Sequence, residues 1–450
     1  MTDAIDLHTH ILPAGWEDFA ARFGGDRWPR LVGDPTAKCR LYVGATFNRY
    51  LDPNAFDPAR RLEDMDRCGI ARQMLSPAPP LFCYWAPGPA AAEWCRMVND
   101  SIAQAVSRYP NRYLGAGGLP LQAPDLAVKE LERVAGTLRF PAVEIGASVR
   151  GRDLDDPALA PVWDAAAALG VGIFVHPQAP VAAQERVQLQ NLTQVVGFPL
   201  ETALALTRVI FGGVLERWPQ IRWCFAHGGG AFAAIVARLD HGWAVMNEAR
   251  SAIPRAPSEY ARGVWVDSLT HSPRVLALVL ETFGREHVVL GSDYPFRLGT
   301  EDPIAALEPA ALDADLRRRL LSDNALAFLG LLSPAGAYAR ASMARARSRS
   351  GGGSGLGRRA SRSRLTPACS SVAASAPVRA LVTRCRMRIE ELPTWTSALR
   401  TIRRSPAPST PGTRRSNSNV EKPRCSRRQY SGVRPKAART WALAAVNRWM

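Results

Sequence analysis

The chain has 450 residues, with 57 Lys and Arg against 40 Asp and Glu and a formal net charge of +17 at pH 7. The excess lies at the end, because residues 333–450 hold 25 of the basic side chains and only three acidic ones, which leaves 32 basic against 37 acidic in residues 1–332. The first part therefore has the balance of an ordinary enzyme, and the basic charge says nothing about its ligands. No apolar run approaches the roughly 20 residues of a membrane span. The eight cysteines form no C-x-x-C pair and no export signal precedes the first strand, so we expect reduced thiols and a cytoplasmic protein.

The first predicted strand, residues 4–10 with sequence AIDLHTH, ends in a His-x-His pair. Side chains two apart in a strand point to the same face. His8 and His10 can therefore bind one metal ion from one side, and neutral imidazole suits zinc and its neighbours.

Strand and helix patterns alternate through residues 1–332. Further strands are predicted to end near Pro77, Leu119, Gly146, His176, His227, Asp267 and Asp293. Amphipathic helices are predicted at 58–68, 89–108, 124–135 and 157–168. Eight such units predict a (β/α)8 TIM-type barrel. Residues 11–57, rich in Gly, Pro, Trp and Arg, form a long insertion after the first strand, which we expect to be part of an active-site lid.

Three of the later strands also end in potential metal ligands. The run 171–176 ends in His176, the run 221–227 ends in His227 before Gly228-Gly-Gly230, and the run 287–293 ends in Asp293. A parallel barrel gathers the carboxyl ends of its strands on one face, and that face carries the chemistry. The pattern predicts a metal site there.

Residues 333–450 form a low-complexity tail rich in Arg, Ser and Pro. Such a composition cannot bury enough apolar surface to offset its chain entropy, so we expect disorder. The tail is either a basic arm that binds nucleic acid non-specifically through phosphates or a stretch never selected as protein, such as a shifted reading frame. Its abrupt start favours the second interpretation, and no nucleic-acid-binding motif is visible.

Several motifs together resemble a known family. They include residues 11–13 (ILP), 83–86 (CYWA), 118–124 (GLPLQAP), 225–232 (FAHGGGAF) and 291–296 (GSDYPF). The set resembles the amidohydrolase superfamily and, within it, the family of 2-amino-3-carboxymuconate-6-semialdehyde decarboxylase and related metal-dependent decarboxylases. The resemblance runs from Ile5 to about Leu331.

The resemblance implies a role for each matching residue. His8, His10, His176 and Asp293 match the family's zinc ligands, one ion per chain, and His227 matches its general acid/base. Arg238 matches an arginine that reaches the neighbouring subunit's site in a homodimer, and Phe296 matches an aromatic residue of the pocket.

Two positions depart from the family pattern. The family's carboxylate-binding arginine falls on Asp52, with Arg49 three residues away as a substitute, and a pocket tryptophan falls on Gln194. These changes leave the metal chemistry in place but put the aminocarboxymuconate substrate in question.

The family match implies a non-oxidative decarboxylase that acts on an unsaturated or aromatic carboxylic acid. One alternative is a hydrolase of the same superfamily that cleaves a lactone or amide. Another is nucleic-acid binding through the tail. We expect His241 and His287 to be structural, while His271 and Glu144 stay open between an ordinary role and a place beside the site.

Overall fold

The computed structural model describes residues 3–178, 184–187 and 191–332. Eight parallel strands hydrogen-bond in the order β1-β5-β6-β7-β10-β11-β12-β13. Their bounds are β1 Ile5–Ile11, β5 Arg72–Pro77, β6 Tyr113–Gly118, β7 Ala142–Gly146, β10 Gly172–His176, β11 Trp223–Phe225, β12 Trp265–Asp267 and β13 Val288–Val289.

Backbone hydrogen bonds across the first and last strands close the sheet into a barrel. Leu7 N–H donates to Leu290 O at 2.9 Å, and His10 N–H donates to Tyr294 O at 2.7 Å. Asp293 N–H returns a bond of 2.8 Å to His8 O. The (β/α)8 prediction is confirmed, and the closure brings the first and last potential ligands together.

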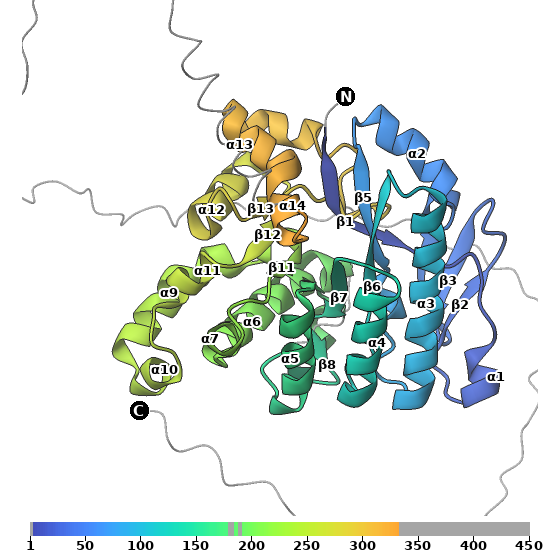
Figure 1. Cartoon of the computed structure of the whole chain (residues 1–450), viewed down its shortest axis with the longest axis horizontal. Helices are drawn as coiled ribbons and strands as arrows, with labels where there is room; N and C mark the ends of the chain where they lie inside the picture. The colour runs from blue at the N-terminus through green and yellow to red at the C-terminus, as the bar shows by residue number, and fades with distance from the viewer. Residues whose placement is uncertain (1–2, 179–183, 188–190, 333–450) are drawn as a thin grey trace, which may run out of the picture. The chain divides into compact units, whose positions relative to one another are not determined.

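Helices follow the strands in turn around the barrel (Figure 1). Their bounds are α2 Pro58–Arg67, α3 Gly88–Arg108, α4 Pro124–Gly136, α5 Ala160–Leu169, α6 Phe198–Phe211, α7 Val214–Arg217, α8 Ala226–Gly229, α9 Phe232–Val245, α10 Asn247–Ala252, α11 Pro257–Ala261, α12 Pro273–Phe283, α13 Ala314–Arg318 and α14 Asn324–Phe328. The four predicted helices match α2 to α5 within a few residues. Pro at the first turn favours this start in each of the four, because its missing N–H is not needed there.

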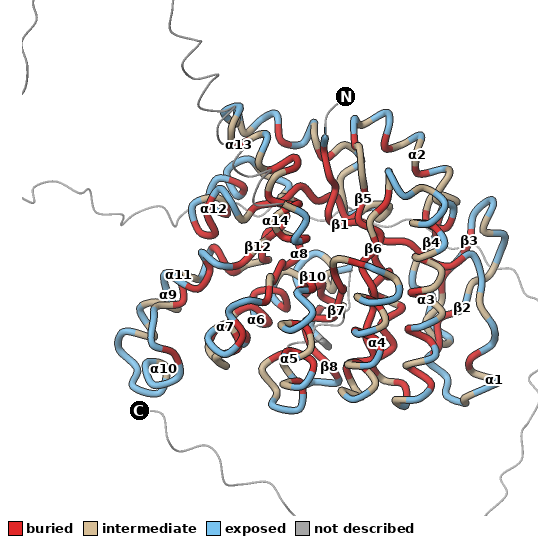
Figure 2. The backbone as a smooth tube through the Cα atoms, in the orientation of Figure 1, coloured by how far each residue is buried: buried red, intermediate tan, exposed pale blue. Residues whose placement is uncertain are grey.

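A small apolar cluster fills the barrel interior below the site. Leu7, Met74 and Phe174 from the strands are buried with Phe328 and Leu329, at the end of the last helix among the described residues. The strands lie in the buried zone of Figure 2, while the outward faces of the helices are exposed. Helix α14 therefore closes one end of the barrel and leaves the other for the site.

The insertion after β1 contains a sheet. Helix α1 (Phe19–Phe23) leads to three antiparallel strands, β2 Pro29–Val32, β3 Cys39–Val43 and β4 Thr46–Leu51. A short hairpin, β8 Ser148–Val149 and β9 Arg152–Asp153, follows β7. The insertion is thus more regular than the loop we expected, and the pairing of β4 with β3 holds Arg49 at a definite register.

One helical stretch, Thr193–Phe211, is longer and more apolar than the sequence inspection suggested. By length and hydropathy alone it could cross a membrane, with a mean hydropathy of 1.3 and 44% of it buried inside the protein. It includes α6, which packs against α8 and α9. It is therefore a covering helix of the barrel. The expected disorder of residues 333–450 concerns residues outside the described ones.

Candidate active site

A bulge in β1 explains how this strand serves both the core and the site. Between Asp6 and Thr9, β1 advances three residues while β5 advances two. The extra residue breaks the strand's alternation. Leu7 packs in the barrel cluster, and the ring of the next residue, His8, lies 5.0 Å from the ring of Phe174 in the same cluster. His8 and His10 then both face the interior.

Four buried donors converge at the carboxyl ends of the strands. One ligand atom each from His8, His10, His176 and Asp293 lies within 4.8 Å of all the others. His10 Nε2 lies 3.2 Å from His8 Nε2 and 3.0 Å from Asp293 Oδ1. Three imidazoles and one carboxylate at these separations form a cluster suited to a single divalent cation.

Each histidine is oriented by an acceptor on its other nitrogen. His8 Nδ1 lies 2.6 Å from Asp267 Oδ2, and His10 Nδ1 lies 3.1 Å from the carbonyl of Pro77. His176 Nδ1 lies 2.5 Å from the carbonyl of Pro177. If each Nδ1 carries the proton, each Nε2 presents a lone pair to the centre of the cluster.

The electrostatics of the cluster suit a cation. Burial holds the pKa of His176 well below its usual value, so its ring is neutral. Burial also lowers the pKa of His10, but Glu144 and Asp293 outweigh this and raise it to about 9. Among the described residues, His176 Nε2 is buried without a hydrogen-bond partner, and Asp293 Oδ1 faces the Nε2 atoms of His8, His10 and His176 at 3.5, 3.0 and 4.0 Å. Orphaned atoms of this kind are what a bound metal would satisfy.

His227 lies beside the cluster on a strained turn. Its backbone is left-handed, with φ of 58°, and Gly228, Gly229 and Gly230 continue in that region. A Cβ on Gly230 would overlap the carbonyl of Pro199, so glycine is required there. His227 Nε2 lies 3.9 Å from Asp293 Oδ2, and the side chain is 17% exposed. The turn therefore brings a partly exposed imidazole next to the four potential metal ligands.

Asp267 holds this turn and His8 at once. Its side chain is fully buried, and Oδ2 accepts from His8 Nδ1 and from the backbone N–H of His227 at 2.8 Å. Oδ1 accepts from the N–H groups of Gly228 and Leu269 at 2.8 and 3.0 Å. Burial raises the pKa of Asp267, but the interactions with His8 and His227 outweigh it and lower that pKa below its usual value. The sequence predicts Asp267 only as the end of a strand, and a carboxylate at that position is the one signal of its role.

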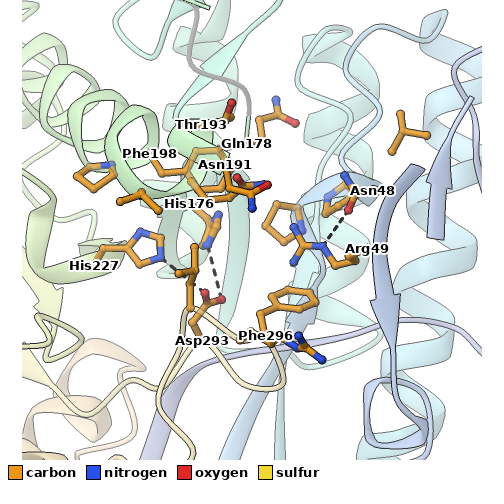
Figure 3. Close-up of a pocket in the computed structure, with 18 of the residues that line it drawn as sticks. Asn48, Arg49, His176, Gln178, Asn191, Thr193, Phe198, His227, Asp293 and Phe296 are labelled. Carbon is orange, nitrogen blue, oxygen red and sulfur yellow. Dashed lines mark hydrogen bonds and ion pairs between the residues drawn. The ribbon is translucent and has the colours of Figure 1, made fainter. Parts of the chain in front are cut away.

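A cavity of about 1470 Å³ opens above the donors. Arg49 reaches it from β4, with its guanidinium carbon 4.2 Å from the ring centroid of Phe296, and Phe296 stacks on His10 at 5.3 Å. Figure 3 shows Arg49, Phe296, His227 and Asp293 around one space. Burial lowers the pKa of Arg49, while Asp293 opposes the shift. An arginine thus lies on the cavity wall near the metal donors.

The two departures from the family pattern also lie on the wall. Asp52 and Gln194 both line the cavity, and Asp52 Oδ1 lies 3.8 Å from Lys38 Nζ. Arg238 is exposed on α9 and is absent from the described lining of its own chain's cavity. A role for Arg238 would therefore require another subunit.

Of the remaining candidates, Glu144 and His271 lie at the site, and His241 and His287 lie away from it. Glu144 is fully buried, with Oε1 3.7 Å from His10 Nδ1. His271 lines the cavity at an exposed position, His241 is exposed on α9, and the ring of His287 packs edge-on against Trp265 at 4.6 Å.

An eight-stranded parallel barrel with three imidazoles and a carboxylate at its carboxyl face defines a class of protein, the metal-centre α/β barrels. Comparison with known families specifies it further: the chain belongs to the amidohydrolase family, which matches residues 5–331. The resemblance found in the sequence motifs is confirmed.

Individual relatives are similar over most of the barrel. The chain is 38% identical over 329 residues to 2-amino-3-carboxymuconate-6-semialdehyde decarboxylase of Dictyostelium discoideum, covering 73% of this chain and 91% of that one. The structure of 5-carboxyvanillate decarboxylase from Sphingomonas paucimobilis matches with a TM-score of 0.63 at 23% identity, covering 74% of this chain and all of that one. A dihydroxybenzoic acid decarboxylase from Polaromonas, with bound manganese and 2-nitroresorcinol, matches with a TM-score of 0.60 at 22% identity, covering 75% of this chain and all of that one.

Proposed function

We propose that this protein is a metal-dependent, non-oxidative decarboxylase, a carboxy-lyase that acts on an unsaturated or aromatic carboxylic acid. The observation that carries the proposal is the buried cluster of three imidazoles and one carboxylate. It lies below a cavity lined by Arg49 and by His227, a histidine outside the cluster. Similarity to the Dictyostelium decarboxylase supports it, and its substrate, 2-amino-3-carboxymuconate 6-semialdehyde, is the first compound to test.

His8, His10, His176 and Asp293 would hold one divalent ion, with zinc as our first candidate because imidazole nitrogen and carboxylate oxygen suit it. When bound, such an ion supplies a Lewis acid that stabilises negative charge developing on the substrate. The Polaromonas structure contains manganese, so manganese is the second ion to test.

The other residues of the cavity would bind the substrate and supply a proton. Arg49 would bind a substrate carboxylate through its planar guanidinium, and Phe296 would support the substrate's flat face. Loss of CO2 breaks one carbon–carbon bond and leaves an electron pair on carbon. His227 would donate the proton that forms the new C–H bond, because its imidazole is the exposed acid/base beside the cluster. No oxidant is needed for this balance.

Replacement of His176 by Ala tests the metal centre. We expect dialysed His176→Ala protein to lose its metal and its activity, while His241→Ala, a change of an exposed histidine on α9, keeps both. Stoichiometric metal and full turnover in His176→Ala would reject the ligand assignment. CO2 release without uptake of water supports the lyase, whereas ring opening of a lactone or cleavage of an amide would support the hydrolase alternative.

We further infer a homodimer. The outward faces of α6, α9 and α12 carry exposed apolar side chains, among them Leu200, Leu204, Ile235, Val275 and Leu278. Arg238 lies on the same helix as Ile235 and is also exposed. A second copy on this face would cover the apolar surface, and Arg238 could then bind substrate in the partner's cavity.

Hybrid dimers test this assembly. Arg238→Lys should raise KM strongly with little change in metal content, because Lys does not reproduce a bidentate carboxylate contact. Mixing it with inactive His227→Ala protein should restore activity, since one site of each hybrid then has both intact residues. A fully active monomer by light scattering would reject the shared site.

Residues 1–332 are proposed to be the complete catalytic unit, in the cytoplasm, with residues 333–450 dispensable. A chain truncated after Leu332 should keep its turnover number. Any weak, salt-sensitive DNA binding by the full chain should disappear with the tail. Loss of activity on truncation would show that the tail contributes to the enzyme.

A further inference from the structure

Arg61 is a fully buried arginine behind the metal donors, outside the cavity lining. It lies in α2, which begins at Pro58 with Asp57 as its N-cap, where the Asp57 side chain accepts from Ala59 N–H. Burial lowers the pKa of Arg61, yet guanidinium stays protonated in proteins. Burying this cation is costly unless its donors are used, so its contacts are informative.

The first contact is with the strand that carries two donors. Arg61 Nη1 donates to the carbonyl of His10 at 2.6 Å. The N–H of His10 is already bound to Tyr294 O at 2.7 Å. The carbonyl of His10 is therefore held by α2 and its N–H by the segment after β13. These two bonds fix the backbone position from which the imidazole extends.

The second contact is with the segment that carries the fourth donor. The guanidinium carbon of Arg61 lies 4.6 Å from the ring centroid of Tyr294, the residue after Asp293. The Tyr294 hydroxyl donates to Asp64 Oδ2 at 2.6 Å, and Asp64 is one turn along the same helix. Helix α2 thus holds Tyr294 by its face and by its hydroxyl.

Two weaker contacts follow, while Nη2 is buried without a hydrogen-bond partner among the described residues. Arg61 Nε donates to Gln73 Oε1 on β5 at 3.2 Å, and Nη1 reaches the carbonyl of Asn54 at 3.4 Å. Asn54 lies in η1 (Pro53–Ala55), directly after the strand that carries Arg49. One side chain therefore touches β1, β5, the insertion and the segment after β13.

We propose that Arg61 is a positioning residue of the metal centre, which sets the separation of His10 from Asp293 by holding the backbone of one and the neighbour of the other. This inference rests on the proposed metal centre. The guanidinium donates from two nitrogens, Nη1 to His10 O and Nε to Gln73 Oε1, while its planar face lies on Tyr294, whereas lysine has one nitrogen and no planar face.

Arg61→Lys and a matched control test the proposal. Arg222→Lys changes another arginine that donates to two backbone carbonyls, Phe328 O and Gly170 O, beside the helix that closes the far end of the barrel. Metal affinity is measured by competition with a chelator, the metal-free proteins are compared by thermal unfolding, and cobalt-substituted proteins by their visible spectra.

We expect Arg61→Lys to weaken metal binding by about 10- to 100-fold, the range for residues that orient ligands, and to shift the cobalt spectrum. Arg222→Lys should lower thermal stability to a similar extent without either effect. Tyr294→Phe, which keeps the ring and removes only the bond to Asp64, should weaken binding in the same direction by a smaller factor.

Wild-type affinity in Arg61→Lys, or an equal loss of affinity in Arg222→Lys, would overturn the proposal. If Arg61→Lys does not fold, an unchanged affinity in Tyr294→Leu, which removes the ring beneath the guanidinium, would overturn it. Failure of the wild-type protein itself to bind any divalent metal would refute the metal centre, so the two failures are distinguishable.

Discussion

Replacing Asp267 by Asn provides a sharp test of how the metal donors are prepared. The change preserves shape and removes one negative charge. Each carboxylate oxygen of Asp267 accepts from two donors: His8 Nδ1 and His227 N–H on one side, Gly228 and Leu269 N–H on the other. An amide offers only one such oxygen, so one pair of donors must face an NH2 group.

Of the two orientations of the new amide, the one that directs its NH2 group to His8 leaves fewer hydrogen-bonding groups without a partner. The His8 ring can then move its proton from Nδ1 to Nε2 and accept from the amide, which leaves only His227 N–H unmatched. This tautomer puts a proton where the metal lone pair is needed. Binding a metal must reverse the shift, and the metal-bound variant then lacks the hydrogen bond to a charged carboxylate that His8 has in the wild type, worth about 1.5–3 kcal/mol. That cost corresponds to roughly 10- to 150-fold in affinity.

The assay compares dissociation constants from chelator competition with the thermal stability of the metal-free proteins. Asp240→Asn is the control, because the Asp240 carboxylate accepts one backbone N–H, from Ser258 at 2.9 Å, away from the cluster. We expect Asp267→Asn to lose metal affinity far beyond the control while keeping most of its metal-free stability. Wild-type affinity in Asp267→Asn would refute the reasoning that its charge selects the His8 tautomer.

Three further outcomes are expected. His227→Ala should keep its metal and lose about 100-fold or more in kcat, as for a lost general acid; unchanged turnover would remove His227 from the mechanism. Because the pKa of His10 is about 9 in the metal-free protein, metal binding at pH 7 should release close to one proton, and affinity should fall about tenfold for each pH unit below 9; calorimetry in two buffers of different ionisation enthalpy measures this, and no release would contradict the assignment. Arg49→Lys should raise KM by about tenfold or more with unchanged metal content, whereas Arg40→Lys, an exposed change on β3, should not; equal KM values would remove Arg49 from substrate binding.

Local sequence predicted the barrel because each strand is a short apolar run next to a helix pattern. The predicted ends at Pro77, Gly146 and His176 coincide with the ends of β5, β7 and β10. The ends of β11 and β13 were predicted less well. β11 ends at Phe225 and β13 at Val289, so His227 and Asp293 lie in turns beyond them, with φ of 58° and 60°. A left-handed residue after a strand has no clear signature beyond the glycines that follow His227.

The donor pair on β1 was predicted for an incomplete reason. Simple alternation puts His8 and His10 on one face, but it also puts Leu7 on the other. The bulge between Asp6 and Thr9 brings all three to the interior, and pairing with β5 decides this. Asp267 and Arg61 depend on contacts across hundreds of residues or between separate elements, which periodicity does not encode.

The insertion shows the same limit. Its composition indicated a loop over the active face, and the structure places Arg49 on that face, but the three-stranded sheet arises from pairing among short strands of mixed polarity. Strands of this kind are decided by their partners more than by their own sequence.

The closure of the barrel between β1 and the segment after β13 also has a consequence for biogenesis. His8 and His10 are synthesised first, and Asp293 emerges from the ribosome nearly 300 residues later. The donor set therefore exists only after the final seam has formed, and an ion bound there fastens the two ends of the barrel together. At a free metal concentration 100 times the dissociation constant, such binding adds about 2.7 kcal/mol to the stability of the folded chain. Cells starved of the metal should accordingly contain less of this protein. The amount of metal bound to the purified protein should then report the fraction of chains whose barrel has closed between β1 and the segment after β13.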